Sequence, residues 1–164
     1  MTTPDSVPTC NEEAERAVLG IMLLDNTCIP SVSAILAASD FSARKLQVTY
    51  EVILGLRAHG QPADLITVSA RLRELGGKGD VGTYVLTLTN AIPTSGNLEH
   101  YARIVHELAS KRRAEALATE YLEGRLENSA YLEQIAALRN GQAKPREVRV
   151  LGVQTFWNTQ PSST

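Results

Sequence analysis

The chain has 164 residues, 43% of them hydrophobic, and a mean hydropathy of −0.11, which predicts one globular domain of ordinary size plus a tail. Sixteen Lys and Arg residues against 18 Asp and Glu residues give a formal charge of −2. This balance argues against a protein whose main task is gripping DNA phosphates, because that contact usually requires a basic excess.

Cysteine and histidine spacing, and the lack of long apolar runs, exclude several further classes. Cys10 and Cys28 form neither a disulfide framework nor a zinc pattern with the three scattered histidines. No apolar run approaches the ~20 residues of a membrane span, and the first residues lack the features of a signal peptide. We therefore expect a cytoplasmic protein with no metal, no cofactor and no membrane contact.

The first half of the chain predicts about five short helices. Residues 1–10 look like a flexible arm, and Asn11 is a good N-cap for a helix over about Glu12–Leu24, with three glutamates at its positive end. Further helices are expected over about Pro30–Ala38, from a Ser42 cap to Gly60, from an Asp64 or Thr67 cap to Gly76, and around residues 84–91. On propensity alone, the last could equally be a strand; helix is preferred because no partner strand is evident.

The second half predicts a helical hairpin. Asn97 is expected to cap a long helix that continues to about Glu123, roughly 40 Å at 1.5 Å per residue, and Ser129 starts a last helix. The predicted fold is therefore all-α, a compact head of about five short helices followed by a long hairpin. The expected divisions are 1–10 (arm), 11–96 (head), 97–140 (hairpin) and 141–164 (linker or tail). Within the tail, residues 148–157 are interpreted as a possible start of a following domain.

Four blocks of sequence, in the same order as in a known family, carry a resemblance. They are residues 8–25 (PTCNEEAERAVLGIMLLD), Asp40-Phe41 with Tyr50, residues 60–68 (GQPADLITV) and residues 93–107 (PTSGNLEHYARIVHE). Together they resemble the N-terminal domain of the DnaB-type replicative DNA helicases. The chain stops where that family's motor domain would begin.

The resemblance implies a role in DNA replication through protein–protein contacts. In that family the domain builds a ring collar and recruits primase into the primosome. The expected partners are thus the chain itself as a dimer or larger ring-type oligomer, primase or another replisome protein, and a helicase motor in cis or in trans. DNA is expected to bind only weakly or indirectly. No G-x-x-x-x-G-K-[ST] phosphate loop occurs, so we expect no enzyme activity from this chain alone.

Two groups of residues in the hairpin are candidate contact sites, and no catalytic or metal-binding residues are assigned. The first is an apolar face that a two-helix hairpin cannot bury by itself, with packing onto the head as the competing explanation. It comprises Leu117, Tyr121, Tyr131, Leu132, Ile135 and Leu138. The second is the basic run Lys111, Arg112 and Arg113, which is either a solvated face or a contact with an acidic partner or with DNA.

Two alternative functions remain open from the sequence. A stand-alone copy of the domain, for example from a mobile element, could modulate a host helicase ring by forming mixed collars. The second alternative is a small helical DNA-binding protein, and the lack of a basic excess argues against it.

Overall fold

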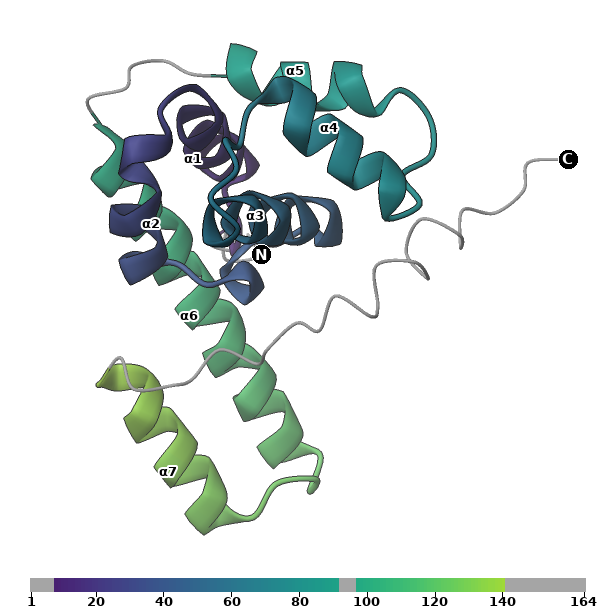
Figure 1. Cartoon of the computed structure of the whole chain (residues 1–164). Coiled ribbons are helices and arrows are strands. Elements are labelled where there is room, and N and C mark those ends of the chain that lie inside the picture. The colour runs from purple at the N-terminus through teal and green to yellow at the C-terminus, as the bar shows by residue number, and fades with distance from the viewer. Residues whose placement is uncertain (1–7, 92–96, 141–164) are drawn as a thin grey trace, which may run out of the picture.

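The computed structural model describes residues 8–91 and 97–140, and within them every regular element is helical, as predicted (Figure 1). The elements are α1 (Glu12–Leu24), η1 (Asn26–Cys28), α2 (Ile29–Ile35), η2 (Ala38–Asp40), α3 (Arg44–Ala58), α4 (Leu65–Glu74), α5 (Val81–Asn90), α6 (Leu98–Leu122) and α7 (Asn128–Arg139). The predictions for residues 1–7 and for the 141–164 tail lie outside the described residues.

Helix α1 is the centre of the head. The Asn11 side chain accepts a hydrogen bond from the Ala14 amide at 3.0 Å, as expected of an N-cap. Nine of the thirteen α1 residues are buried, and the helix packs against α3, α5 and α6. A helix that is apolar on most sides is buried on most sides, so α3, α5 and α6 assemble around it.

Two predicted boundaries in the first half were wrong. Helix α2 ends at Ile35 rather than at Ala38, and the Leu36 carbonyl accepts a hydrogen bond from the Tyr50 hydroxyl at 2.8 Å. Ser42 does not cap α3. Instead, the N-cap of α3 is Ala43, which makes no side-chain cap bond.

The next two helices agree with the prediction and close the head. Asp64 and Thr67 form a reciprocal capping box at the start of α4. The residues for which a strand was the alternative form α5, whose N-cap Asp80 accepts from the Thr83 amide at 2.9 Å. The Thr49 and Tyr84 hydroxyls, 2.9 Å apart, link α3 to α5.

Helix α6 belongs to two parts of the molecule. Its first half adds Ala102, Val105 and Ala109 to the buried core, and its last turns extend beyond the head and pack against α7 (Figure 1). Asn97 occupies the N-cap position of α6, but its side chain makes no cap bond. The described core is thus one cluster made by α1–α5 and the start of α6.

No single helix within residues 8–91 and 97–140 is long and apolar enough to cross a membrane. Helix α1 taken with residues Asn26–Ile35 meets the length and composition requirement only as a pair bent by 113°.

Candidate interface on the hairpin arm

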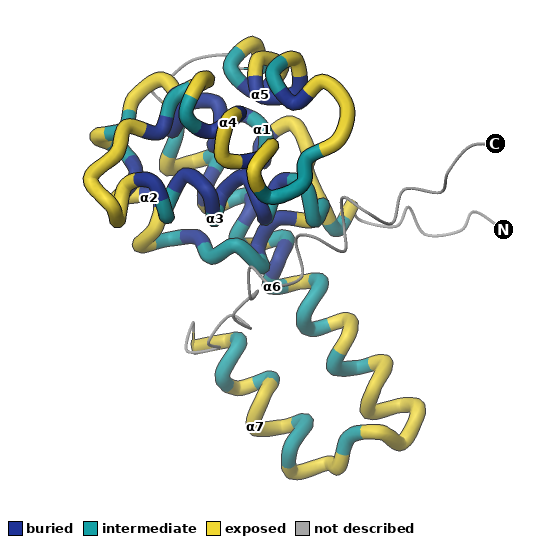
Figure 2. Tube along the Cα trace, turned by 45° about the vertical axis from the view of Figure 1, so that its right-hand side comes forward, coloured by how far each residue is buried: buried dark blue, intermediate teal, exposed yellow. Residues whose placement is uncertain are grey.

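The part of the molecule that projects from the head is the arm, which we define as residues 114–139, the last third of α6 and all of α7. No residue of α7 is buried, and the last buried residue of α6 is Ala109. Figure 2 shows the arm as a two-helix projection with no dark-blue (buried) segment. Packing onto the head, the competing explanation for its apolar residues, is therefore not what the structure shows.

The turn of the arm is set by Gly124. Its φ of 72° lies in the left-handed region that favours glycine. The Arg125 amide donates to the Glu120 carbonyl at 2.9 Å and the Gly124 amide to the Tyr121 carbonyl at 3.1 Å. These two bonds form a Schellman motif that ends α6 and directs α7 back along it.

Only part of the predicted apolar face is covered where α6 and α7 meet. The rings of Tyr121 and Tyr131 stack at 4.6 Å with an interplanar angle of 17°. The half-buried members of the predicted face are Leu117, Tyr131, Ile135 and Leu138.

Three large apolar side chains of the arm remain exposed. Leu132 is 58% exposed and Tyr121 is 38% exposed, and both belong to the predicted face. Leu122 is 82% exposed and was not among the predicted site residues. Its place directly before the Gly124 turn, next to Tyr121 in the apolar stripe of α6, was the signal that could have identified it. Within the described residues, nothing covers these apolar side chains near the tip of the arm.

The junction between arm and head is organised by Asp40 of η2. Its side chain is only 2% exposed and forms an ion pair with Arg113. It also accepts from the Ala37 amide at 3.0 Å and lies 3.3 Å from Nδ1 of His106. A carboxylate buried this deeply requires such partners, so Asp40 fixes the point at which α6 leaves the head.

The basic run Lys111–Arg113 is divided by this junction. The Arg112 guanidinium donates to the Thr9 and Asp40 carbonyls at 2.5 and 2.6 Å, and Arg113 is paired with Asp40. Neither is therefore a solvated side chain. Contact of these two arginines with a partner stays a prediction that must compete with bonds inside the chain. Lys111 is exposed.

A second buried carboxylate, Glu15 of α1, binds Ser42, the residue that was predicted to cap α3. Glu15 is 1% exposed, and its Oε2 accepts from both the amide and the hydroxyl of Ser42 at 3.0 Å. Burial raises the pKa of Glu15, although the two bonds from Ser42 act in the opposite direction. Helix-dipole complementarity therefore does not account for Glu15, which ties α1 to the start of α3.

The described part of the chain offers surfaces for binding another protein. Among residues 8–91 and 97–140, no group of three His, Cys, Asp or Glu side chains gathers as a metal site would require. The apolar side chains of the arm are suited to contact with another protein, in which their surface would be buried.

Comparison with known proteins gives consistent results. The family described as the DnaB-like helicase N terminal domain matches residues 7–107. The replicative DNA helicase DnaB of Leifsonia xyli is 38% identical over 113 residues, which cover 68% of this chain and 25% of that protein. The replicative DNA helicase DnaC of Bacillus subtilis is 37% identical over 117 residues, or 70% of this chain and 26% of that protein. The chain thus spans about a quarter of the length of these relatives.

Solved structures agree with the sequence comparison. The N-terminal domain of DnaB helicase from Mycobacterium tuberculosis superimposes with a TM-score of 0.70 at 32% identity, covering 82% of this chain and 99% of that one. The corresponding domain from Helicobacter pylori, solved with an account of its interactions with primase, shares the fold with a TM-score of 0.62 at 24% identity, covering 69% and 89%. These matches do not favour a mobile-element modulator or a small DNA-binding protein, and the chain belongs to the DnaB-like helicase N-terminal domain family.

Proposed function

We propose that this chain is the oligomerisation and partner-docking domain of a replicative DNA helicase, with the arm as the surface on which subunits pair. The observation that carries the proposal is the uncovered apolar surface near the arm tip, Tyr121, Leu122 and Leu132. Exposed apolar side chains that gather in one region are typical of protein–protein contacts.

A two-fold pair of arms is the simplest solution, because a self-complementary patch favours a closed dimer. Each leucine removed from water contributes about 1.5–3 kcal/mol, and two-fold symmetry buries Leu122 and Leu132 of both subunits. Four such side chains contribute at most about 6–12 kcal/mol, since Leu132 is already partly covered, which is comparable to the roughly 4–15 kcal/mol that association costs. The tyrosine pair adds area, so a dimer or larger ring-type oligomer is favoured.

The ATPase and unwinding activities of a helicase are expected of a different domain. The chain contains no phosphate-binding loop, so ATP hydrolysis and unwinding are expected of a motor domain, in cis or in trans, and not of this polypeptide. Primase or another replisome protein is the proposed docking partner, and the Helicobacter pylori relative supports this choice. The net charge of −2 supports weak DNA binding at physiological salt.

The test of arm pairing is the double variant Leu122→Asp/Leu132→Asp, followed by light scattering after size exclusion. Burying a carboxylate in an apolar contact is costly, so we expect the variant to be monomeric where the wild type is a dimer or larger. Ile135, although part of the predicted face, is half-buried and is better left intact. Ser129→Asp/Gln134→Asp adds the same charge at exposed polar positions of α7 and should leave the assembly unchanged.

Circular dichroism separates dissociation from unfolding. The leucine variant should retain the helical signal of the wild type because neither leucine contributes to the core. A wild type that is monomeric at micromolar concentrations would contradict the proposal. So would a control variant that dissociates as readily as the leucine variant.

A further inference from the structure

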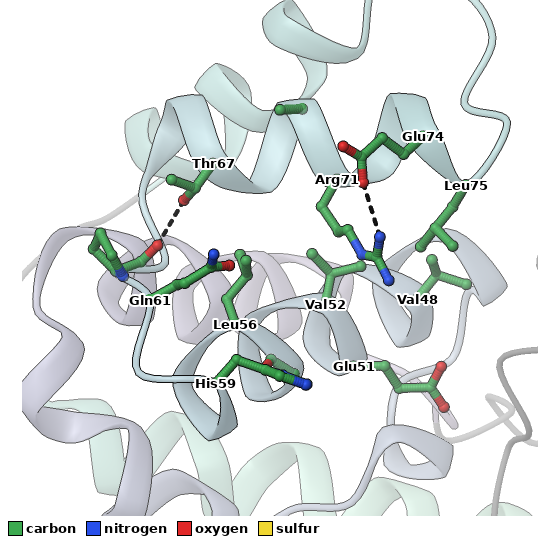
Figure 3. Close-up of a pocket in the computed structure, with 13 residues that line it drawn as sticks. Val48, Glu51, Val52, Leu56, His59, Gln61, Thr67, Arg71, Glu74 and Leu75 are labelled. Carbon is green, nitrogen blue, oxygen red and sulfur yellow. Dashed lines mark hydrogen bonds and ion pairs between the residues drawn. The ribbon is translucent and has the colours of Figure 1, made fainter.

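A groove lies between α3 and α4, on the head and away from the arm (Figure 3). Its volume is about 630 Å³. Val48, Val52 and Leu56 line its α3 side, with Leu75 at the end of α4. The lining positions of α4, 67, 70, 71 and 74, follow helical spacing, so the groove extends along the whole of that helix.

The groove stays open because two of its lining residues are small. Gly55 is in the last third of α3, and a Cβ added to it would meet no atom within 4 Å. Ala70 contributes only a methyl group from α4. Glycine in a helix interior lowers stability. Because no atom would crowd a side chain at Gly55, packing does not require glycine at this position. The absence of a side chain at Gly55 leaves the groove open.

Glu51 gives the groove a chemical preference. Its Oε2 atom is buried without a hydrogen-bond partner, and burial raises the pKa of the carboxyl group despite the nearby charge of Arg44. The second carboxylate of the groove, Glu74, is paired with Arg71 at 2.8 Å. An occupant that brings apolar side chains and one cation would complete both the apolar lining and the bonding of Glu51.

One segment of this chain has that chemistry. Residues 145–157 read PREVRVLGVQTFW, which combines two arginines and one glutamate with apolar residues that end in Phe156 and Trp157. We propose that this segment binds in the α3–α4 groove of its own chain, with its apolar side chains along Leu75 and the accessible edges of Val52 and Leu56, and an arginine, Arg146 or Arg149, on Glu51.

The covalent chain permits this contact. Helix α7 runs back toward the head, so its C-terminal end lies at the head side of the arm (Figure 1). The 16 residues from Asn140 to Phe156 can span at most about 58 Å at up to 3.6 Å per residue. That exceeds the roughly 37 Å length of α6, the longest helix described, at 1.5 Å per residue. The inference does not rest on arm pairing, because the groove and the arm share no residue.

Trp157 makes the proposal measurable, since it is the single tryptophan of the chain. In the full chain we expect its emission to lie to the blue of that of a synthetic peptide of residues 145–164. Covering about half of an indole should lower the acrylamide quenching constant roughly twofold. Gly55→Phe fills the groove and should restore peptide-like emission and quenching. Ala58→Phe places the same ring at an exposed position of α3 outside the groove and should leave the protection of Trp157 intact.

Charge variants test the same contact from both sides. Glu51→Gln and the tail variant Arg146→Gln/Arg149→Gln should each raise the quenching constant toward that of the peptide, and circular dichroism should show both folded. These two variants decide the matter if Gly55→Phe alters the helical signal.

Three results would overturn the proposal. One is a wild-type Trp157 as accessible as that of the peptide, and another is protection that survives both Gly55→Phe and Glu51→Gln. The third is protection that disappears on dilution, which would assign the segment to the groove of a second copy. Leu122→Asp/Leu132→Asp should not change Trp157, so failure of the arm proposal and failure of this one are distinguishable.

Discussion

The head and the arm use similar residues with opposite outcomes. In the head, apolar stripes on α1, α3, α4 and α5 meet one another, and residues such as Leu19, Met22 and Ile53 are completely buried. In the arm, α7 carries leucine, isoleucine and tyrosine at helical spacing, yet none of its residues is buried. The head therefore completes its core within one chain, whereas the arm retains apolar surface that no other part of residues 8–91 and 97–140 covers.

The comparison shows that a helical stripe identifies an apolar face but not what covers it. A stripe becomes core only where several helices converge, as they do around α1. Two antiparallel helices alone cover one strip of each other, and the opposite sides remain in water. Substitutions in the head should therefore affect folding, and those on the arm surface should affect association.

The largest expected effect is that of Phe41→Ala in the head. Phe41 is 1% exposed, and its ring lies 5.0 Å from that of Tyr50, so truncation should cost about 3–5 kcal/mol of unfolding free energy. Leu132→Ala on the arm should cost the monomer under about 0.5 kcal/mol. Urea titration followed by circular dichroism measures both. Similar losses at the two positions would show that the arm is folded into the core and contradict the comparison.

An intermediate effect is expected at the junction, from Asp40→Asn. This change keeps the shape but removes the charge that Arg113 and His106 face. Breaking a buried ion pair costs about 3–5 kcal/mol; because the Arg113 side chain is 26% exposed, we expect about 2 kcal/mol. The matched control is Arg71→Gln, whose ion pair with Glu74 is exposed and should contribute under about 1 kcal/mol. Hydrogen exchange should report faster opening of the middle of α6 in Asp40→Asn only. Unchanged exchange there would refute the role assigned to Asp40.

The smallest expected effect concerns a helix cap of the head. Hydrogen bonds from Thr67 and from the Ile66 amide hold the pKa of Asp64 below its ordinary value. Because the folded-state pKa is the lower one, this stabilisation is present above the ordinary carboxyl pKa and is lost as the pH falls through the lowered value. Asp64→Ala should cost about 1 kcal/mol at neutral pH.

Asp64→Asn provides the control for that cap, because asparagine also caps helices well. It should retain most of the stability at neutral pH and lose part of the dependence on acid. Urea midpoints between pH 7 and the acid limb compare the three proteins. An Asn variant with the full wild-type pH profile would show that Asp64 does not contribute to it.

Local signals predicted most of the fold. The observed bounds of α1 are the predicted ones because Asn11 at its start and Asp25 at its end act within a few residues. Ser42 was wrongly predicted as a cap, because its amide and hydroxyl bond to Glu15, a residue 27 positions earlier. A single sequence gives no information on such a distant partner.

The candidate site was predicted less completely, for the same reason. The apolar residues of the arm are visible as a stripe, but whether Leu132 or Ile135 faces water depends on how α7 lies on α6. Arg112 and Arg113 both bond to Asp40, which precedes them by more than 70 positions. These bonds were likewise not deducible from the sequence, so the basic run could be interpreted as a solvated face. Leu122 was missed because its exposure follows from the Gly124 turn.

Helix α6 makes the molecule a lever. It is one continuous helix of 25 residues with neither glycine nor proline between Leu98 and Leu122. The ion pair between Asp40 and Arg113 holds it to the head near its middle. A helix of about 37 Å without glycine or proline transmits rotation, so if arms pair as proposed, a tilt of about 10° at the pair displaces the head end of α6 by roughly 6 Å. Any rearrangement of subunits at the arms would therefore reach the outer surface of each head as a movement of the whole head.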